Sequence, residues 1–285
     1  MNRYAKPAAL DEALALLAEG NWRPLAGGTD IYPALGNRPL REDMLDLNGL
    51  AELEGISETA THVVIGARTT WTQIARHELP PALGALQAAA REVGSIQIQN
   101  RATIAGNLCN ASPAADGVPA LLVLDAEVEL RRQGAVRHLP LRDFILGNRR
   151  TALQPGELLT AIRLPKPSLA GASAFEKLGA RRYLVISIAM AAARLAVRDG
   201  IVTDTAIAIG ACSAVATRLG GLEAMLIGQP ANGALAEVVA QAPLAELSPI
   251  DDVRGSAQYR RAAAREIVTR ALAAAAGATN ERAAA

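Results

Sequence analysis

Two short glycine-containing segments, far apart in the chain, constrain its fold more than any other feature. Residues 26–30 read AGGTD and residues 103–107 read TIAGN, and each follows a run predicted to be extended. The backbone N–H groups of such a turn can converge on an anion, and a helix that begins there adds its dipole. If folding brings the two turns together, they can hold a pyrophosphate without lysine or arginine, with further hydrogen bonds from Thr29, Thr103 and Asn107.

Either segment alone is typical of an ordinary tight turn. Neither G-x-G-x-x-G nor G-x-x-x-x-G-K-[ST] occurs in the chain, which excludes the usual Rossmann and P-loop ways of binding a nucleotide. A nucleotide therefore has to be held in another way.

The apolar pattern predicts a mixed α+β protein. In the first part we expect helices at 8–19, 31–35 and 81–93, strands at 24–26, 44–47, 63–65, 126–130 and 158–164, and extended chain entering a turn at 95–107. After a Pro- and Gly-containing boundary at 165–172 we expect strands at 174–178, 186–197 and 201–211, then helices at 219–227, 234–242 and 256–276. The pair Asp199-Gly200 predicts a hairpin between two of these strands.

Charge and cysteine content exclude several classes of function. The chain has 29 Lys and Arg against 28 Asp and Glu, without the basic surplus that nucleic-acid binding requires. Its two cysteines cannot form a metal motif or supply the four thiolates of an iron–sulfur cluster. No apolar N-terminal region and no apolar run of about 20 residues is present, so we expect a cytoplasmic protein without a transmembrane segment.

Several single residues receive structural interpretations. The three histidines have no helical partner and are predicted to lie at the surface, and Cys109 is predicted to be a small buried residue. Trp71 and Tyr183 are expected in the core, with a place beside a flavin as the alternative for Tyr183. Pairs of arginines such as Arg149-Arg150 are expected on a solvated face or at a subunit contact.

Four segments, taken in order, resemble one family. They are 24–31 (PLAGGTDI), 93–107 (VGSIQIQNRATIAGN), 112–116 (SPAAD) and 175–182 (FEKLGARR). The chain resembles the FAD-binding medium subunit of molybdenum hydroxylases, of the carbon monoxide dehydrogenase and xanthine dehydrogenase type, over essentially its whole length.

The resemblance implies a vanillyl-alcohol-oxidase or PCMH-type FAD-binding domain at 1–170. This domain would consist of two α/β subdomains, about 1–57 and 58–170, with FAD extended between them. A C-terminal α+β flavoprotein domain with an antiparallel sheet and helices would follow at 173–280.

The resemblance also implies which residues contact FAD, with the two glycine motifs at its pyrophosphate. Carried over position by position, they are Pro24, Leu25, Ala26, Gly27, Gly28, Thr29, Asp30, Ile31, Thr103, Ile104, Ala105, Gly106, Asn107, Asp116, Leu159 and Lys177. Val93 matches a further position that is equally compatible with the core. Ala105 replaces the usual first glycine of the second motif, which requires a negative φ or absorbed strain.

The function implied is that of an electron-transfer subunit. A large molybdopterin subunit and a small subunit with [2Fe–2S] clusters would be its partners, expected as a dimer of heterotrimers. FAD would receive electrons from the clusters and pass them to an external acceptor, so no catalytic or metal-binding residue is assigned to this chain.

Two alternatives stay open at this level. One is a self-contained FAD oxidase of the same superfamily, and the other is a scaffold subunit without flavin. The C-terminal part is poor in His, Tyr and Trp, which disfavours the oxidase, and the presence of both glycine segments disfavours the scaffold. The substrate and the acceptor cannot be read from this chain.

Overall fold

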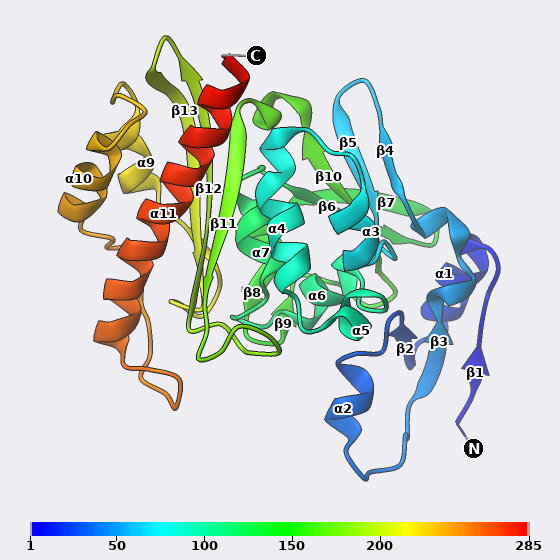
Figure 1. Cartoon of the computed structure of the whole chain (residues 1–285). Helices are drawn as coiled ribbons and strands as arrows, with labels where there is room; N and C mark the ends of the chain where they lie inside the picture. Colours follow the sequence, from blue (N-terminus) through cyan, green and yellow to red (C-terminus); the bar gives the residue numbers. More distant parts are fainter. Residues whose placement is uncertain (1, 284–285) are drawn as a thin grey trace.

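Three larger β-sheets form the framework of the protein (Figure 1). The computed structural model describes the backbone of residues 2–283 and the side chains of residues 2–279. No helix in this described part is both long and apolar enough to cross a bilayer.

The first sheet is small and parallel, with strand order β1-β3-β2. Its elements are β1 (Tyr4–Ala5), β2 (Trp22–Leu25) and β3 (Asp43–Asp46), with α1 (Leu10–Ala18) between β1 and β2. Leu10, Leu14 and Leu17 recur at the spacing of one helix face and pack on Leu45 of β3. The helix predicted at 8–19 and the strand predicted at 44–47 are thereby confirmed.

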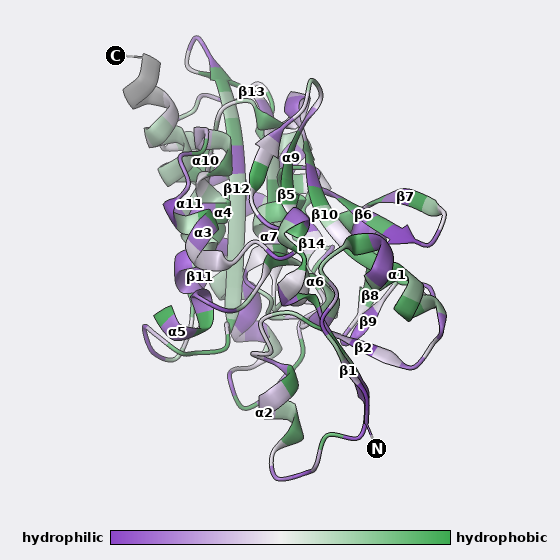
Figure 2. Ribbon diagram, turned by 90° about the vertical axis from the view of Figure 1, so that its right-hand side faces the viewer, coloured by the Kyte–Doolittle hydropathy of each residue, from purple (hydrophilic) through white to green (hydrophobic). Residues whose placement is uncertain are grey.

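Helix α2 (Ile31–Leu35) follows the first glycine motif and has no buried residue. Figures 1 and 2 both show α2 and the segment leading to β3 standing apart from the sheets. The first motif therefore lies where the body of the protein joins a projecting arm.

The second sheet has five antiparallel strands in the order β4-β5-β10-β6-β7. They are β4 (Ile56–Glu58), β5 (His62–Gly66), β10 (Leu158–Pro165), β6 (Glu127–Arg132) and β7 (Ala135–Pro140). The predicted strands at 63–65, 126–130 and 158–164 are confirmed, and the last of them forms the centre of the sheet. Ile65 and Ile162 of this sheet share a core with Trp71, which is fully buried as predicted.

Short helices and one hairpin accompany this sheet. They are α3 (Trp71–Arg76), α4 (Gly84–Glu92), α5 (Ile96–Gln99), α6 (Ile104–Asn110), α7 (Gly117–Leu122), α8 (Leu141–Phe144), β8 (Ile145–Gly147) and β9 (Arg150–Thr151). The expectation of extended chain at 95–107 is wrong, because α5 and the start of α6 occupy much of it. α5 and α6 have at most two turns each, too short for a visible helical period.

The third sheet is antiparallel, with strand order β11-β12-β13-β14. Its strands are β11 (Ala172–Leu178), β12 (Ala189–Arg198), β13 (Ile201–Gly210) and β14 (Thr217–Arg218), followed by α9 (Gly220–Leu226), α10 (Ala234–Gln241) and α11 (Ala257–Ala283). Asp199 and Gly200 have φ of 53° and 76° between the paired residues Arg198 and Ile201, which confirms the predicted hairpin.

Both faces of the third sheet are buried. Ala191 and Ala193 of β12 pack in the core with α11, whereas Met190 and Ala192 pack in the core of the second sheet and its helices. A central strand covered on both sides has no polar alternation, which explains why β12 is apolar except for Arg194, whose buried guanidinium pairs with Asp204 of β13, and the terminal Arg198 (Figure 2). The predicted C-terminal antiparallel sheet with helices is confirmed, and it is packed firmly against the rest of the chain.

Candidate functional site: a cleft between two glycine motifs

The two glycine motifs meet in space. A Cβ placed on Gly27 would lie 2.0 Å from the carbonyl oxygen of Arg101 and 3.0 Å from Cα of Ala102, directly before the second motif. Only a residue without a side chain permits this approach of the two backbones. The central expectation of the sequence analysis, that the two segments come together, is confirmed.

A cleft with a cavity volume of about 700 Å³ opens along both motifs. Thirteen of the predicted residues line it: Pro24, Ala26, Gly27, Gly28, Thr29, Asp30, Ile31, Thr103, Ala105, Gly106, Asn107, Asp116 and Leu159. Val93 lines it as well. Leu25, Ile104 and Lys177 are not among the lining residues: Leu25 and Ile104 are buried in the core, and Lys177 lines a second cavity.

The first motif presents unpaired backbone donors to the cleft. Within residues 2–283, the amide N–H groups of Gly27, Gly28, Thr29 and Asp30 donate no hydrogen bond to the protein. Gly28 has a φ of 72°, a conformation that L side chains rarely adopt, and a Cβ there would lie 2.5 Å from the ring of Tyr32. Such a run of free amides is typical of a site that binds an anion.

The second motif is built differently from the expected turn. Thr103 caps α6, and its Oγ1 accepts a hydrogen bond from the N–H of Gly106 at 3.1 Å. The next amides donate to protein as well, Ile104 to Thr69 O at 3.0 Å and Ala105 to Ala67 O at 3.2 Å. This motif therefore offers the cleft side chains rather than the amides of the first turn of α6.

Asn107 is the clearest of these side chains. It lines the cleft, and its buried Oδ1 has no hydrogen-bond partner within the described residues. Leaving a buried acceptor without a partner costs free energy, so a ligand that donates a hydrogen bond to this oxygen gains that energy on binding.

The alanine that departs from the family motif fits without strain. Ala105 lies within α6 and is absent from the residues with positive φ. Its methyl group is nearly buried at the wall of the cleft. The negative φ fulfils the condition under which alanine can replace glycine at this position.

A buried ion pair lies at the wall of the cleft, which Asp116 lines. Lys177 Nζ lies 2.6 Å from Asp116 Oδ2, and the Ser187 hydroxyl donates to Asp116 Oδ1 at 2.6 Å. Lys177 also donates to the carbonyl oxygen of Glu92 at 3.1 Å. Burial raises the pKa of the Asp116 carboxyl, while Lys177 and Ser187 act in the opposite direction. Asp116 and Lys177, each predicted separately to contact FAD, thus pair with one another and connect the third sheet to the cleft.

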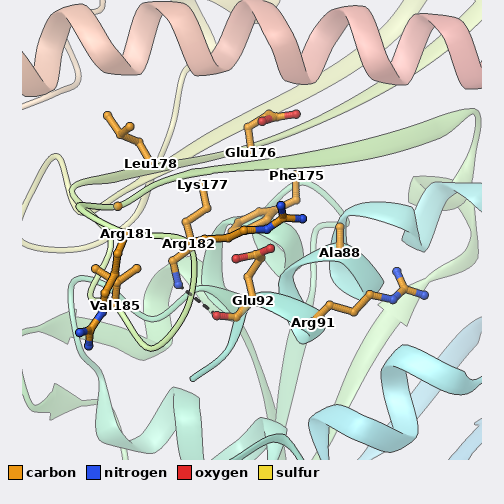
Figure 3. A pocket seen from close by; sticks show the side chains of 11 residues that line it. Ala88, Arg91, Glu92, Phe175, Glu176, Lys177, Leu178, Arg181, Arg182 and Val185 are labelled. Carbon is orange, nitrogen blue, oxygen red and sulfur yellow. Dashed lines mark hydrogen bonds between the residues drawn. The ribbon is translucent and has the colours of Figure 1, made fainter. Parts of the chain in front are cut away.

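Lys177 also lines a second cavity, of about 480 Å³, between β11 and α4 (Figure 3). Figure 3 shows Lys177 reaching toward Glu92 and Val185 at the edge of this cavity. Val185 lines both cavities, so the segment after β11 separates them. Tyr183 in this segment is 63% exposed, and the expectation that it packs in the core is wrong.

Sequence reasoning missed three residues at the cleft. Cys109 was expected to be buried, yet it is exposed and lines the cleft, because α6 turns this side outward. Asn110 lies three positions after Asn107, on the same helix face, a spacing that would have indicated it. Arg149 lines the cleft from the turn between β8 and β9, for which the sequence holds no local signal.

Comparison with known proteins identifies the family to which the chain belongs. The chain belongs to the family of the FAD-binding medium subunits of molybdenum hydroxylases: residues 1–167 match the FAD binding domain in molybdopterin dehydrogenase. Residues 173–275 match the CO dehydrogenase flavoprotein C-terminal domain. The α+β class and the family resemblance are thereby confirmed.

Individual relatives agree with this assignment. The chain is 37% identical over 236 residues to the nicotinate dehydrogenase FAD-subunit of Eubacterium barkeri, covering 80% of each chain. It is 36% identical over 277 residues to the carbon monoxide dehydrogenase medium chain of Afipia carboxidovorans, covering 94% of each. The solved CO dehydrogenase from Oligotropha carboxidovorans matches with a TM-score of 0.87 and 32% identity, covering 98% of both chains.

Proposed function

We propose that this chain binds FAD in the cleft and passes electrons from the iron–sulfur clusters of a partner subunit, through FAD, to an external acceptor. The observation that carries the proposal is the run of free amides from Gly27 to Asp30, which donate toward a cleft that the two glycine motifs share. A cleft that offers several donors and a volume of about 700 Å³ fits a dinucleotide with a central diphosphate.

The residues at the cleft would hold the cofactor through different kinds of contact. In this proposal the amide N–H groups of the first motif donate hydrogen bonds to the diphosphate, and Thr103 and Asn107 add polar contacts from α6. Leu159 contributes an apolar wall, while the pair of Asp116 and Lys177 links the cleft to β11 of the third sheet. Leu25 and Ile104 would support the motifs from the core rather than contact FAD.

Bound FAD would supply the redox chemistry, since it can exchange electrons with both one-electron and two-electron partners. The protein chain would bind the cofactor, orient it and control its access to water. This role requires no side chain to act as an acid or a base.

The proposal includes the assembly as well. A large molybdopterin subunit and a small iron–sulfur subunit would join this chain, as a dimer of heterotrimers in the cytoplasm. The substrate would be selected by the large subunit. We also propose the division into an FAD-binding unit at 1–170 and a C-terminal unit at 173–280.

One experiment tests the central claim. The full chain is produced alone and together with candidate partner subunits, and its flavin content is measured from the absorption spectrum. Stoichiometric FAD, with copurification of molybdenum- and iron-containing partners, is the expected result. Turnover of a substrate by the lone flavin-loaded chain would instead indicate an oxidase, and failure to bind FAD would indicate a scaffold subunit.

A further inference from the structure

Three arginines line the cleft, and two of them are neutralised by carboxylates. Arg23 forms an ion pair with Glu42, and Arg68 lies 3.4 Å from Glu54. Arg149 is different: within the described side chains, it has no carboxylate at ion-pair distance, and it is exposed to solvent. It is therefore the lining arginine with its charge available to a ligand.

A chain of hydrogen bonds connects Arg149 to the first glycine motif. The Arg149 guanidinium donates to Asn110 Oδ1, and Asn110 Nδ2 donates to Asp30 Oδ1 at 2.9 Å. The Asp30–Asn110–Arg149 chain thus spans three elements: the first motif, α6 and the turn between β8 and β9. Only the side chain of Asn110 therefore stands between the guanidinium and Asp30 of the motif whose amides are free.

The backbone of Arg149 is fixed in an unusual conformation. Its φ is 58°, in the left-handed region, and its N–H donates to the carbonyl oxygen of Ala111 at 3.0 Å. Ala111 itself ends α6 with a φ of 48°. A non-glycine residue in this region costs about 1 kcal/mol, so the surrounding contacts hold the turn against α6.

We propose that Arg149 binds the diphosphate of FAD, with Asn110 as its positioning residue. This inference rests on the proposed function, because it takes the cleft to be the FAD site. The diphosphate carries full negative charges, whereas the amides of the first motif offer partial positive charges, and the carboxylate of Asp30 stands at the same turn. A guanidinium suits a phosphate because it donates two parallel hydrogen bonds.

From the sequence alone, the two glycine motifs were expected to hold the pyrophosphate without lysine or arginine. With Arg149 included, binding of FAD should depend on salt, since a charge pair at a solvent-accessible site is screened by ions.

In the test, the full chain is freed of flavin and titrated with FAD at low and at high salt. Flavin fluorescence reports the binding. Arg149→Gln is compared with wild type and with Arg150→Gln, a neighbouring exposed arginine that does not line the cleft. We expect Arg149→Gln to weaken FAD binding about 10- to 100-fold at low salt, the loss typical of a hydrogen bond to a charged group. Arg149→Lys should retain part of the affinity, and Arg150→Gln all of it.

Competition with ADP and with adenosine identifies the group that Arg149 contacts. Wild type should favour ADP over adenosine, and Arg149→Gln should reduce this preference while leaving adenosine unaffected. Asn110→Ala keeps Arg149 but removes its acceptor, so it should give a smaller loss in the same direction. This second variant keeps the test decisive if Arg149→Gln does not fold.

Two results would overturn the inference. One is wild-type affinity and salt dependence in Arg149→Gln, and the other is an equal loss for ADP and adenosine. Either result leaves the proposed function intact as long as the wild-type chain binds FAD. Failure of the wild-type chain to bind FAD at all would overturn the proposed function itself, so the two failures are distinguishable.

Discussion

Replacing Gly27 with alanine perturbs the contact between the two motifs and little else. The added Cβ would lie 2.0 Å from the carbonyl oxygen of Arg101 and 2.6 Å from its carbonyl carbon. Gly27 does not have a positive φ, so alanine is conformationally allowed there. The expected damage is therefore steric and confined to the place where the motifs meet.

The size of the effect follows from the distances. Since Cβ contacts below 3.0 Å are essentially never observed, the two backbones must move apart by at least about 1 Å. Overpacking of this kind typically costs about 1–3 kcal/mol of folding stability, and no side chain can rotate to relieve it. A shift of 1 Å stretches hydrogen bonds of about 2.9 Å beyond their useful length. Loss of two bonds to a charged group would weaken FAD binding by about 100-fold or more.

Thermal unfolding of the flavin-free chain measures the loss of folding stability, and FAD titration measures the loss of affinity. Gly220→Ala is the matched control, because a Cβ at Gly220 meets no atom within 4 Å and its φ is not positive. We expect the control to behave as wild type in both assays. Wild-type stability together with wild-type FAD affinity in Gly27→Ala would show that the motifs do not meet as described.

Three further outcomes are expected. Gly28→Val should abolish retention of FAD, because the residue has a φ of 72° and a branched side chain would meet the ring of Tyr32; normal flavin content would contradict this. Thr103→Val should lower stability by about 1 kcal/mol through loss of the cap, with Thr103→Ser as a control that keeps the wild-type melting temperature. Asp252→Asn should cost about 3 kcal/mol at neutral pH, because it leaves the buried guanidinium of Arg260 without its carboxylate. Hydrogen bonds from Arg254 lower the pKa of Asp252, so this difference is present above pH about 4 and disappears as the pH falls through the folded-state pKa; urea titrations at several pH values measure it.

Local signals were sufficient for much of the fold. The hairpin at Asp199-Gly200 depends on two adjacent residues that favour positive φ, and α1 depends on one apolar face. Non-local pairing had no such signal: β10 lies between β5 and β6, from which it is far in sequence. The helices in 95–107 were missed because each is short and the cap at Thr103 precedes a glycine-containing segment.

At the candidate site, too, local features were predicted and those that depend on non-local contacts were missed. The first motif was predicted with its position and its free amides, since both follow from consecutive residues. The second was located correctly, but the use of its amides within the protein depends on contacts with Ala67 and Thr69. Arg149 reaches the cleft through the packing of a separate turn on Ala111, which no pattern within residues 145–151 indicates.

The ion pair between Asp116 and Lys177 has a consequence for how such proteins can be rearranged. One charge comes from the segment before α7 and the other from β11, and both are nearly buried. Residues 1–167 produced alone would keep a carboxylate at the cleft after losing both its ammonium partner and the Ser187 hydroxyl. A chimera that joins the first part of one relative to the last part of another must carry compatible residues at all three positions. The cofactor cleft is thus a shared property of both parts of the chain, although nearly all of its lining comes from the first.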